Sequence, residues 1–354
     1  MPQGWWRLPL ACVAMFAATA PSRAVAADDT PHDRSWTLRI DDDFLALSGR
    51  DADYTGGFAY ALADDTPVGP RWLARALDWI DDALRVPRAG AGSERDAFEI
   101  GVQLFTPRDL TAEQALPDDR PYANLLYASS STLARAEDRD IVRQTTFTIG
   151  VLGLPLVGDL HRSLHELLGS PLPNGYAHQI SDGGEPTFRY TFSSRRLMAS
   201  GTLGGRPYSA RFGFTANLGY LTDASAEIAI RSGPDGVPWW SARPPISDYA
   251  GQPPIRSAGD GAASPRGLLF EGGLAVRARV YDAFLQGQAR RSDVTFSSSE
   301  LNHLLLEAWF GLSTELKGGL AISYSLRWQS PEIANGTGSR SFSWGTLSFA
   351  RAFR

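Results

Sequence analysis

The feature that most constrains the fold is a strict two-residue alternation of apolar and polar side chains. The clearest example spans residues 208–220, where aromatic and aliphatic residues alternate with Ser, Arg, Gly, Thr and Asn. Residues 320–329 repeat the pattern, with apolar residues at the even positions and, apart from Ala321, polar residues at the odd ones. Because successive side chains of a strand point to opposite faces, each segment predicts a strand with one apolar face and one polar face.

Similar segments recur along the chain, and an amphipathic helix is expected over residues 70–86. The even count of about twelve strands, joined by alternating short and long connections, is typical of an all-β, transmembrane antiparallel β-barrel. A soluble β-sandwich is the alternative, and the length of the strands counts against it. The expected strands are approximately 36–41, 54–63, 97–105, 122–134, 145–151, 186–203, 208–220, 268–280, 283–296, 304–314, 320–329 and 341–353.

The N-terminus predicts export. Arg7 precedes an apolar run over residues 8–20, and Ala24-Val25-Ala26 supplies the small residues of a cleavage site. This pattern is typical of a secretory signal peptide, so we expect residues 1–26 to be the signal and residues 27–354 the barrel domain. The single cysteine, Cys12, lies within the predicted signal, which leaves the mature chain without disulfides. The net charge of −5 argues against a nucleic-acid partner.

The expected topology gathers polar segments at one end of the barrel. If the first strand starts in the periplasm, the acidic run Asp41–Asp43 lies toward the outer end. Connections 106–120, 152–185 and 223–267 then become outer loops, whereas the helix over 70–86 falls on the periplasmic side. We therefore expect the acidic run and the connection over residues 152–185 to converge in space.

That connection carries three of the five histidines, His161, His165 and His178. Leucines at helical spacing place His161 and His165 one turn apart on a short helix that ends before Pro171. Such a pair is also common on an ordinary exposed helix, and as a metal site it is a weak signal because no HExxH pattern is present. Long ordered loops on rigid β-scaffolds nevertheless tend to carry function.

The acidic run Asp41–Asp43 has two interpretations. It is either a solvated strand edge, the commoner fate of such runs, or a set of oxygen ligands for a hard cation such as Ca²⁺. Alternation directs Asp41 and Asp43 into the barrel. A neutral histidine near such a cation would activate water for attack on an ester, and the sequence lacks the GxSxG elbow of a serine nucleophile.

Several motifs together resemble one family. They are Asp41–Leu45 followed by Asp53-Tyr54-Thr55-Gly56-Gly57; Phe105-Thr106-Pro107 followed by Asp119–Ala123; and Ile149–Gly153 followed by His165, Gly169, Gly175-Tyr176 and Gln179. The chain thereby resembles the outer-membrane lipid A 3-O-deacylases (LpxR), over most of its mature length and most closely in the first half.

The resemblance implies a twelve-stranded outer-membrane barrel that removes the 3′-linked acyloxyacyl group of lipid A (lipopolysaccharide) with Ca²⁺ as cofactor, its active site toward the outer leaflet. It implies that His165 is the general base, that Asp42 and Asp43 are metal ligands, and that Thr55 is a catalytic or substrate-binding residue. Asp stands at position 42 where the family has Asn, so a register of Asp41-Asp42 also stays open.

Two further roles depend on where this chain departs from the family pattern. No lysine is present in residues 108–120, so Arg108 is expected to bind substrate in its place. The carboxylate that orients the histidine is expected to be Glu185, with Glu166 and Asp182 as alternatives. The alternative functions are a catalytically degenerate barrel that serves as a channel or structural protein, and a soluble domain that binds glycans.

Overall fold

The computed structural model of the protein describes residues 34–46, 52–87, 94–135, 140–234, 237–241, 244, 246, 248–253, 255 and 267–353. The predicted signal peptide, residues 1–26, and Cys12 lie outside the described residues. No helix of the described chain is both long enough and apolar enough to cross a membrane.

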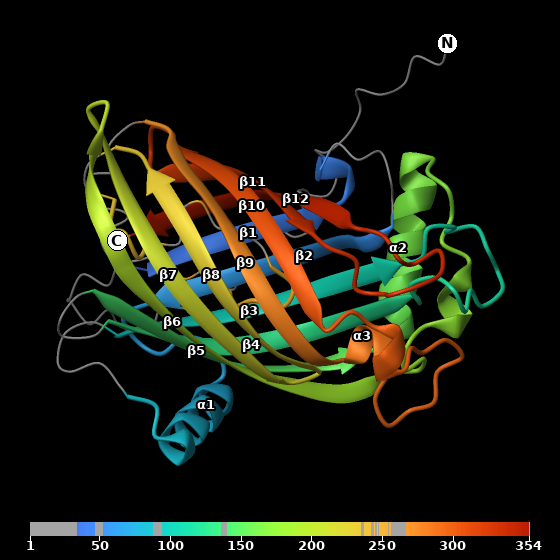
Figure 1. Cartoon of the computed structure of the whole chain (residues 1–354). Coiled ribbons are helices and arrows are strands. Elements are labelled where there is room, and N and C mark those ends of the chain that lie inside the picture. The colour runs from blue at the N-terminus through green and yellow to red at the C-terminus, as the bar shows by residue number, and fades with distance from the viewer. Residues whose placement is uncertain are drawn as a thin grey trace, which may run out of the picture.

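Twelve antiparallel strands form a closed barrel, as predicted, and every strand pairs with its neighbours in sequence (Figure 1). Strand β12 closes the barrel against β1, with Ile40 opposite Leu347. The strands are β1 Arg34–Asp42, β2 Asp53–Asp64, β3 Glu94–Thr106, β4 Ala123–Arg135, β5 Ile141–Leu152, β6 Glu185–Leu203, β7 Arg206–Gly219, β8 Leu221–Ser232, β9 Leu269–Asp282, β10 Leu304–Glu315, β11 Leu320–Gln329 and β12 Phe342–Phe353.

The helices lie in the connections between strands. Helix α1, Arg71–Leu84, joins β2 to β3, and α2, Pro155–Leu168, joins β5 to β6. Figure 1 shows them at opposite ends of the barrel, as the sequence predicts for residues 70–86 and 152–185. The short helices are η1 Phe44–Ala46, η2 Gly175–His178, α3 Ala283–Gln286 and η3 Ser298–Glu300.

Side-chain alternation sorts residues between the lumen and the outer wall. Along β11, Ser323, Ser325 and Arg327 are buried inside the barrel. On the outer wall, large apolar side chains such as Leu218 and Ile230 are exposed to the surroundings. This apolar exterior and polar interior is the arrangement that a membrane-spanning barrel requires.

Two predicted segments are wrong, and their errors cancel in the strand count. Residues 223–267 are predicted as one loop, but Leu221–Ser232 form β8, whereas residues 283–296, predicted as a strand, form α3 and the connection after it. Strand β8 begins after a tight turn at Gly219, where φ is 138° and a Cβ would lie 2.1 Å from the Phe188 carbonyl oxygen. The outward face of its first half carries Thr222, Ala224 and Ala226, so the apolar alternation there is weak.

Because β8 crosses the barrel once more than predicted, the longest connection lies at the opposite end of the barrel from the predicted one. Residues 233–268 follow an even-numbered strand and leave from the end that carries α1, not from the α2 end as predicted. The described residues of this connection, 237–241, 244, 246, 248–253 and 255, include several that enter the barrel, and we name this set the luminal plug. Trp239, Trp240 and Ile255 pack in the lumen against wall residues that include Leu133 and Val142.

The luminal plug is hydrogen-bonded to strands on several sides of the wall. Arg189 of β6 donates to the carbonyl oxygens of Tyr249 and Gly251 at 3.1 and 2.7 Å. Gln103 of β3 and Gln144 of β5 donate to the carbonyl oxygens of Tyr249 and Pro253. These polar groups of the wall and of the luminal plug are paired with each other, as buried polar groups are in a protein core.

Candidate functional site

Helix α2 turns one face, which carries both of its histidines, toward the protein interior. Val157, Gly158, His161 and His165 form the buried face, and Gly158 lies so close to Tyr176 that a Cβ would come within 2.8 Å of its ring. Pro155 occupies the first turn, where its missing N–H has no intrahelical acceptor to satisfy. Gly169 ends the helix in the left-handed region at φ 69°. The helix end thus turns the chain back across the buried face.

This turn brings a carbonyl oxygen to His165. Nδ1 of His165 lies 2.6 Å from the carbonyl oxygen of Pro171, and the amide of Ser170 donates to the carbonyl of His165 at 3.0 Å. A carbonyl oxygen only accepts, so Nδ1 carries the hydrogen in this contact. In the neutral ring, Nε2 is then the basic nitrogen. His165 is 7% exposed, which holds its ring in a fixed orientation.

His161 lies directly beside His165, as their spacing predicts. The two ring centroids are 4.4 Å apart and the rings are nearly perpendicular. Nδ1 of His161 lies 2.8 Å from the hydroxyl of Tyr176. Burial, with a smaller effect from His165, lowers the pKa of His161 to about 3. His161 is therefore neutral at physiological pH and places no positive charge beside His165.

The acidic run at the end of β1 divides between two faces, as alternation predicts. Asp41 is buried, and its carboxylate accepts hydrogen bonds from the hydroxyls of Tyr54 and Thr346, both at 2.8 Å. Asp43 is also buried and accepts from the amide of Ala52 at 2.5 Å. Asp42 is half-buried and accepts from the amide of Phe44 at 2.8 Å.

Thr55 occupies a β-bulge beside this run. The register between β2 and β3 passes from Tyr54 opposite Phe105 to Gly56 opposite Leu104, which leaves Thr55 as the extra residue. Its hydroxyl hydrogen-bonds the hydroxyl of Thr106, and its carbonyl accepts from the amide of Asp43 at 3.3 Å. The structure thus brings Thr55 and Asp43 together through the backbone.

Arg108 and Glu185, the other two predicted site residues, have different surroundings. Arg108 is exposed in the connection between β3 and β4, where its amide donates to Asp119 at 3.0 Å. Glu185 accepts from the hydroxyl of Ser181 at 2.7 Å and from the amides of Ala289 and Arg290. These bonds tie the α2 connection to the connection between β9 and β10.

The pairing of Glu185 with His165 stays a prediction, and the contacts of the structure give each of the two residues another partner. The group at Nδ1 of His165 is the Pro171 carbonyl, six residues along the chain, while the carboxylate of Glu185 binds the amides of a different connection. The alternatives for this role also have other partners. Glu166 is exposed beside Arg162, and Asp182 accepts from Gln179 at 2.7 Å.

A network of buried charges underlies the site, and sequence reasoning missed it. Arg120 lies between the rings of Phe105 and Phe342 and pairs with Glu332. Arg340 bridges Asp53 and Asp119 at 2.8 and 2.6 Å. Asp53 and Asp119 each begin one of the motifs that resemble the family, Asp53–Gly57 and Asp119–Ala123. Their place in these motifs is the sequence signal that could have identified them.

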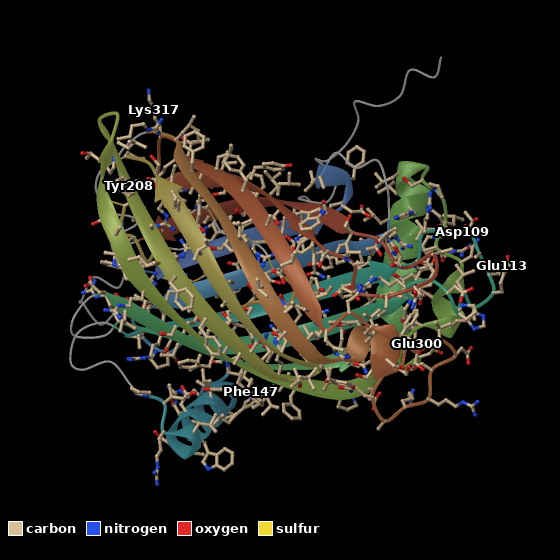
Figure 2. All side chains as sticks on the ribbon, viewed as in Figure 1. Asp109, Glu113, Phe147, Tyr208, Glu300 and Lys317 are labelled. Carbon is tan, nitrogen blue, oxygen red and sulfur yellow. The ribbon has the colours of Figure 1, made fainter. Side chains whose placement is uncertain are left out.

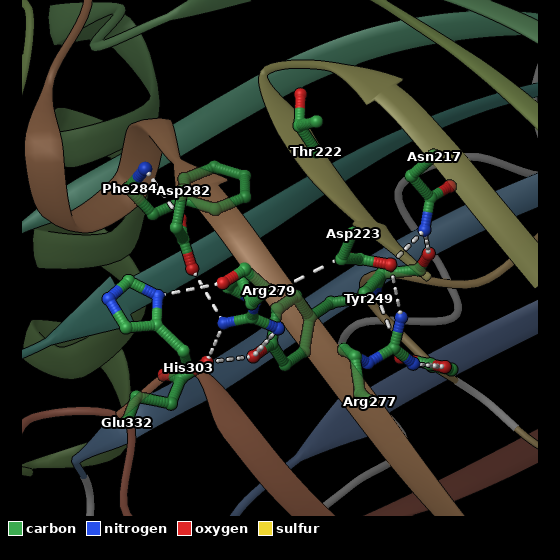
Figure 3. A network of polar contacts seen from close by, with 12 residues as sticks. Asn217, Thr222, Asp223, Tyr249, Arg277, Arg279, Asp282, Phe284, His303 and Glu332 are labelled. Atoms are coloured by element: carbon green, nitrogen blue, oxygen red, sulfur yellow. Dashed lines mark hydrogen bonds and ion pairs between the residues drawn. The ribbon is translucent and has the colours of Figure 1, made fainter. Parts of the chain in front are cut away.

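The luminal plug contributes Tyr249 to this network of buried charges. The hydroxyl of Tyr249 contacts Glu332 and Arg279, and Arg279 donates to Asp282 at 2.7 Å (Figure 3). The Tyr249 ring lies 5.4 Å from that of Tyr54, whose hydroxyl binds Asp41. Asp41 of the acidic run is therefore connected to Glu332 through the side chains of Tyr54 and Tyr249.

Calcium was expected at Asp42 and Asp43. Their carboxylates have the chemistry that a hard cation prefers, and both lie at one strand end. Among the residues that the structure describes, no three His, Cys, Asp or Glu side chains are grouped closely enough to hold a metal ion.

Comparison with known proteins identifies the family. A model of the family described as outer membrane protein LpxR matches residues 8–353. The chain belongs to the LpxR family. The structure of LpxR from Salmonella typhimurium superposes with a TM-score of 0.65 at 16% sequence identity, covering 90% of this chain and 100% of that one. The predicted family and the twelve-stranded fold are therefore confirmed, and the protein is an outer-membrane barrel.

Other similar structures match less well. A KdgM porin gives a TM-score of 0.35 at 6% identity, with 90% of this chain and 99% of that chain covered. The β domain of the Bordetella autotransporter BrkA gives 0.40 at 9% identity, with 92% and 100% covered. Comparison with curated proteins returned no match.

Proposed function

We propose that this LpxR family member hydrolyses the ester that links the 3′-acyloxyacyl group to lipid A in the outer leaflet. The observation that carries the proposal is the contact between Nδ1 of His165 and the Pro171 carbonyl, which assigns the basic nitrogen to Nε2. Family membership supports the substrate class. The end of the barrel that carries α2 is then the outer end.

The proposed reaction needs a base, a water molecule and an ester. Nε2 of His165 takes a proton from water as the oxygen attacks the ester carbonyl carbon, which forms a tetrahedral oxyanion. The carbon–oxygen bond to the sugar then breaks. The sugar oxygen receives the proton from His165, and the acyloxyacyl group leaves as a carboxylic acid, which ionises in water.

The other proposed site residues would assist this step. We propose that the Thr55 hydroxyl, which is bonded to Thr106 and lies near Asp43, binds the substrate or the oxyanion, and that the exposed Arg108 binds an anionic phosphate of lipid A. We propose Ca²⁺ as cofactor with Asp42 and Asp43 among its ligands. When bound, Ca²⁺ would supply positive charge to stabilise the oxyanion.

The outer face of α2 favours a lipid substrate. Leu156, Leu160 and Leu167 lie on one side of the helix and are all more than half exposed. This stripe adjoins the buried face that carries His165. A water-soluble substrate would not require exposed leucines beside the catalytic base, whereas acyl chains would cover them.

The alternative is a degenerate barrel that acts as a channel or structural protein. The luminal plug counts against a channel, because it occupies the lumen and satisfies wall residues such as Arg189 and Gln144. A luminal cavity of about 120 Å³ remains beside the plug.

Mass spectrometry of lipid A from cells that express the protein tests the proposal. The expected result is loss of the acyloxyacyl mass in the presence of Ca²⁺ and its retention with chelator. His165→Ala should lower the rate by about 10²–10⁴-fold. His178→Ala is the matched control, because His178 lies on the same connection but pairs with the exposed Asp293. Unchanged lipid A with a folded wild-type barrel would overturn the proposed function.

A further inference from the structure

Helix α1 lies on the outer wall of the barrel and not across its mouth. Asp81 accepts hydrogen bonds from the hydroxyls of Thr145 on β5 and Tyr190 on β6, both at 2.7 Å. Thr145 and Tyr190 point outward, because their neighbours Gln144 and Arg189 bind the luminal plug. The lipid-facing side of β5 and β6 therefore carries the helix.

The segment before α1 reaches the outer wall in the same way. Gly69 has a φ of 84° and lies against the ring of Phe98, where a Cβ would come within 2.5 Å of the ring atoms. Phe98 points outward, because its neighbour Glu99 binds the luminal Arg39. The chain thus passes from β2 over the rim and down onto the lipid-facing surface before α1 begins.

The helix divides its side chains among three faces. Leu73, Leu77 and Asp81 are buried against the barrel wall. Trp72 and Trp79 lie on a second face with Ala76 and Ala83, and their side chains are 59% and 72% exposed. The third face is charged, with Arg71, Arg75, Asp78 and Asp82 exposed. Two exposed indoles on a short helix need a partner that accepts an apolar ring with a polar edge.

We propose that α1 is an interfacial membrane anchor whose Trp72 and Trp79 bind the phospholipid leaflet at that end of the barrel. The exposed stripe continues toward the lipid-facing wall, where Phe147 of β5 lies near the helix (Figure 2) and its ring centroid is 6.4 Å from that of Phe188 on β6. Tryptophan is enriched at the membrane–water interface, because its ring is apolar and its N–H is polar. The charged face then turns toward water.

The size of the stripe favours lipid over a second copy of the chain. A helix of 14 residues is about 21 Å long, and one face about 10 Å wide offers roughly 200 Å². Stable protein interfaces bury about 800 Å² on each partner. An interfacial helix needs no such area, because the whole barrel is already held in the bilayer. The proposal rests on the barrel fold and not on the proposed hydrolase activity.

Spin labels on two faces of α1 test the proposal. In a Cys12→Ser background, Trp79→Cys and Asp78→Cys are each labelled with a nitroxide in the full chain, folded into vesicles of phosphatidylcholine and phosphatidylethanolamine. The label at 79 is expected to collide several-fold more with dissolved oxygen and less with a water-soluble nickel chelate than the label at 78. Ala83→Cys, on the same face as Trp79, repeats the measurement if Trp79→Cys does not fold.

Two outcomes would overturn the proposal. Equal and high collision rates with the nickel chelate at both positions would place the helix in water. Dipolar broadening at position 79 that disappears on dilution with unlabelled protein would assign the stripe to a second copy of the chain. Heat-modifiable migration on gels checks in each case that the barrel is folded.

Discussion

The carbonyl oxygen of Pro171 lies 2.6 Å from Nδ1 of His165, although Pro171 is six positions further along the chain. The contact exists because Gly169 ends α2 in the left-handed region and turns the chain back over the helix. Many histidine bases are oriented by a carboxylate, whereas here a main-chain carbonyl occupies that position. The orientation of His165 is thus linked to the backbone conformation of a single glycine.

This link predicts different effects for two substitutions at position 169. Gly169→Ala should cost about 1–2 kcal/mol locally, because L-residues disfavour the left-handed region, and should lower kcat for deacylation. Gly169→Asn should retain most of the activity, because Asn tolerates this conformation. Deacylation kinetics of both variants check the prediction, and an Ala variant as active as wild type would contradict it. Among the residues that the structure describes, none beyond the immediate chain neighbours lies within 4 Å of the added Cβ, so crowding by them would not explain a loss.

The depressed pKa of His161 predicts that the α2 connection weakens in acid. Burial lowers this pKa from 6.5 to about 3, so between these values the unfolded state binds more protons than the folded state. The contribution of neutral His161 to stability is fully present above pH 6.5 and is lost as the pH falls toward 3. Hydrogen exchange of α2 measured from pH 7 to pH 4 should show this opening. In His161→Phe the dependence should be smaller, and an identical dependence would refute the assignment.

Asp81 predicts a stability effect on the outer wall. Asp81→Ala removes the acceptor of Thr145 and Tyr190, and hydrogen bonds to charged groups contribute about 1.5–3 kcal/mol each. The urea midpoint of the barrel in lipid vesicles should therefore fall. Asp78→Ala, at an exposed position on the same helix, is the control and should change stability by about 0.5 kcal/mol at most. Equal midpoints for the two variants would show that the buried contacts contribute nothing.

The luminal plug predicts that the barrel does not conduct ions. Replacement of residues 237–255 by a Gly/Ser segment of equal length removes Trp239, Trp240, Tyr249 and Ile255 from the lumen. In planar bilayers the variant should conduct, whereas the wild type should not. Equal conductance of the two proteins would mean that the plug does not close the barrel and would favour the channel alternative.

Alternation was sufficient to predict the barrel, because a membrane-spanning strand must separate apolar from polar side chains. It correctly placed Arg327 in the lumen and α1 and α2 at opposite ends. It failed at β8, where the lumen-facing Asp223 alternates with the small outward residues Thr222 and Ala224. Small residues next to polar ones give little contrast, so the strand resembled a loop.

The candidate site was predictable only in part. The spacing of His161 and His165 indicated one helical face, and alternation correctly directed Asp41 and Asp43 inward. The partner of His165 was not predictable, because a carbonyl group is present at every residue and leaves no signal in the sequence. The ion pairs of Arg340 with Asp53 and Asp119 were equally hidden, since they join connections more than 200 residues apart.

The luminal plug has a consequence for how this protein tolerates mutation over evolution. Its carbonyl groups are matched to particular donors such as Arg189, Gln103 and Gln144, so those inward positions admit few replacements. The outward positions need only to be apolar, and many residues satisfy that requirement. Neutral sequence drift should therefore accumulate on the membrane side of each strand, while the polar residues of the lumen change slowly. In this respect the protein is the reverse of a water-soluble one, whose polar surface drifts and whose apolar interior is retained.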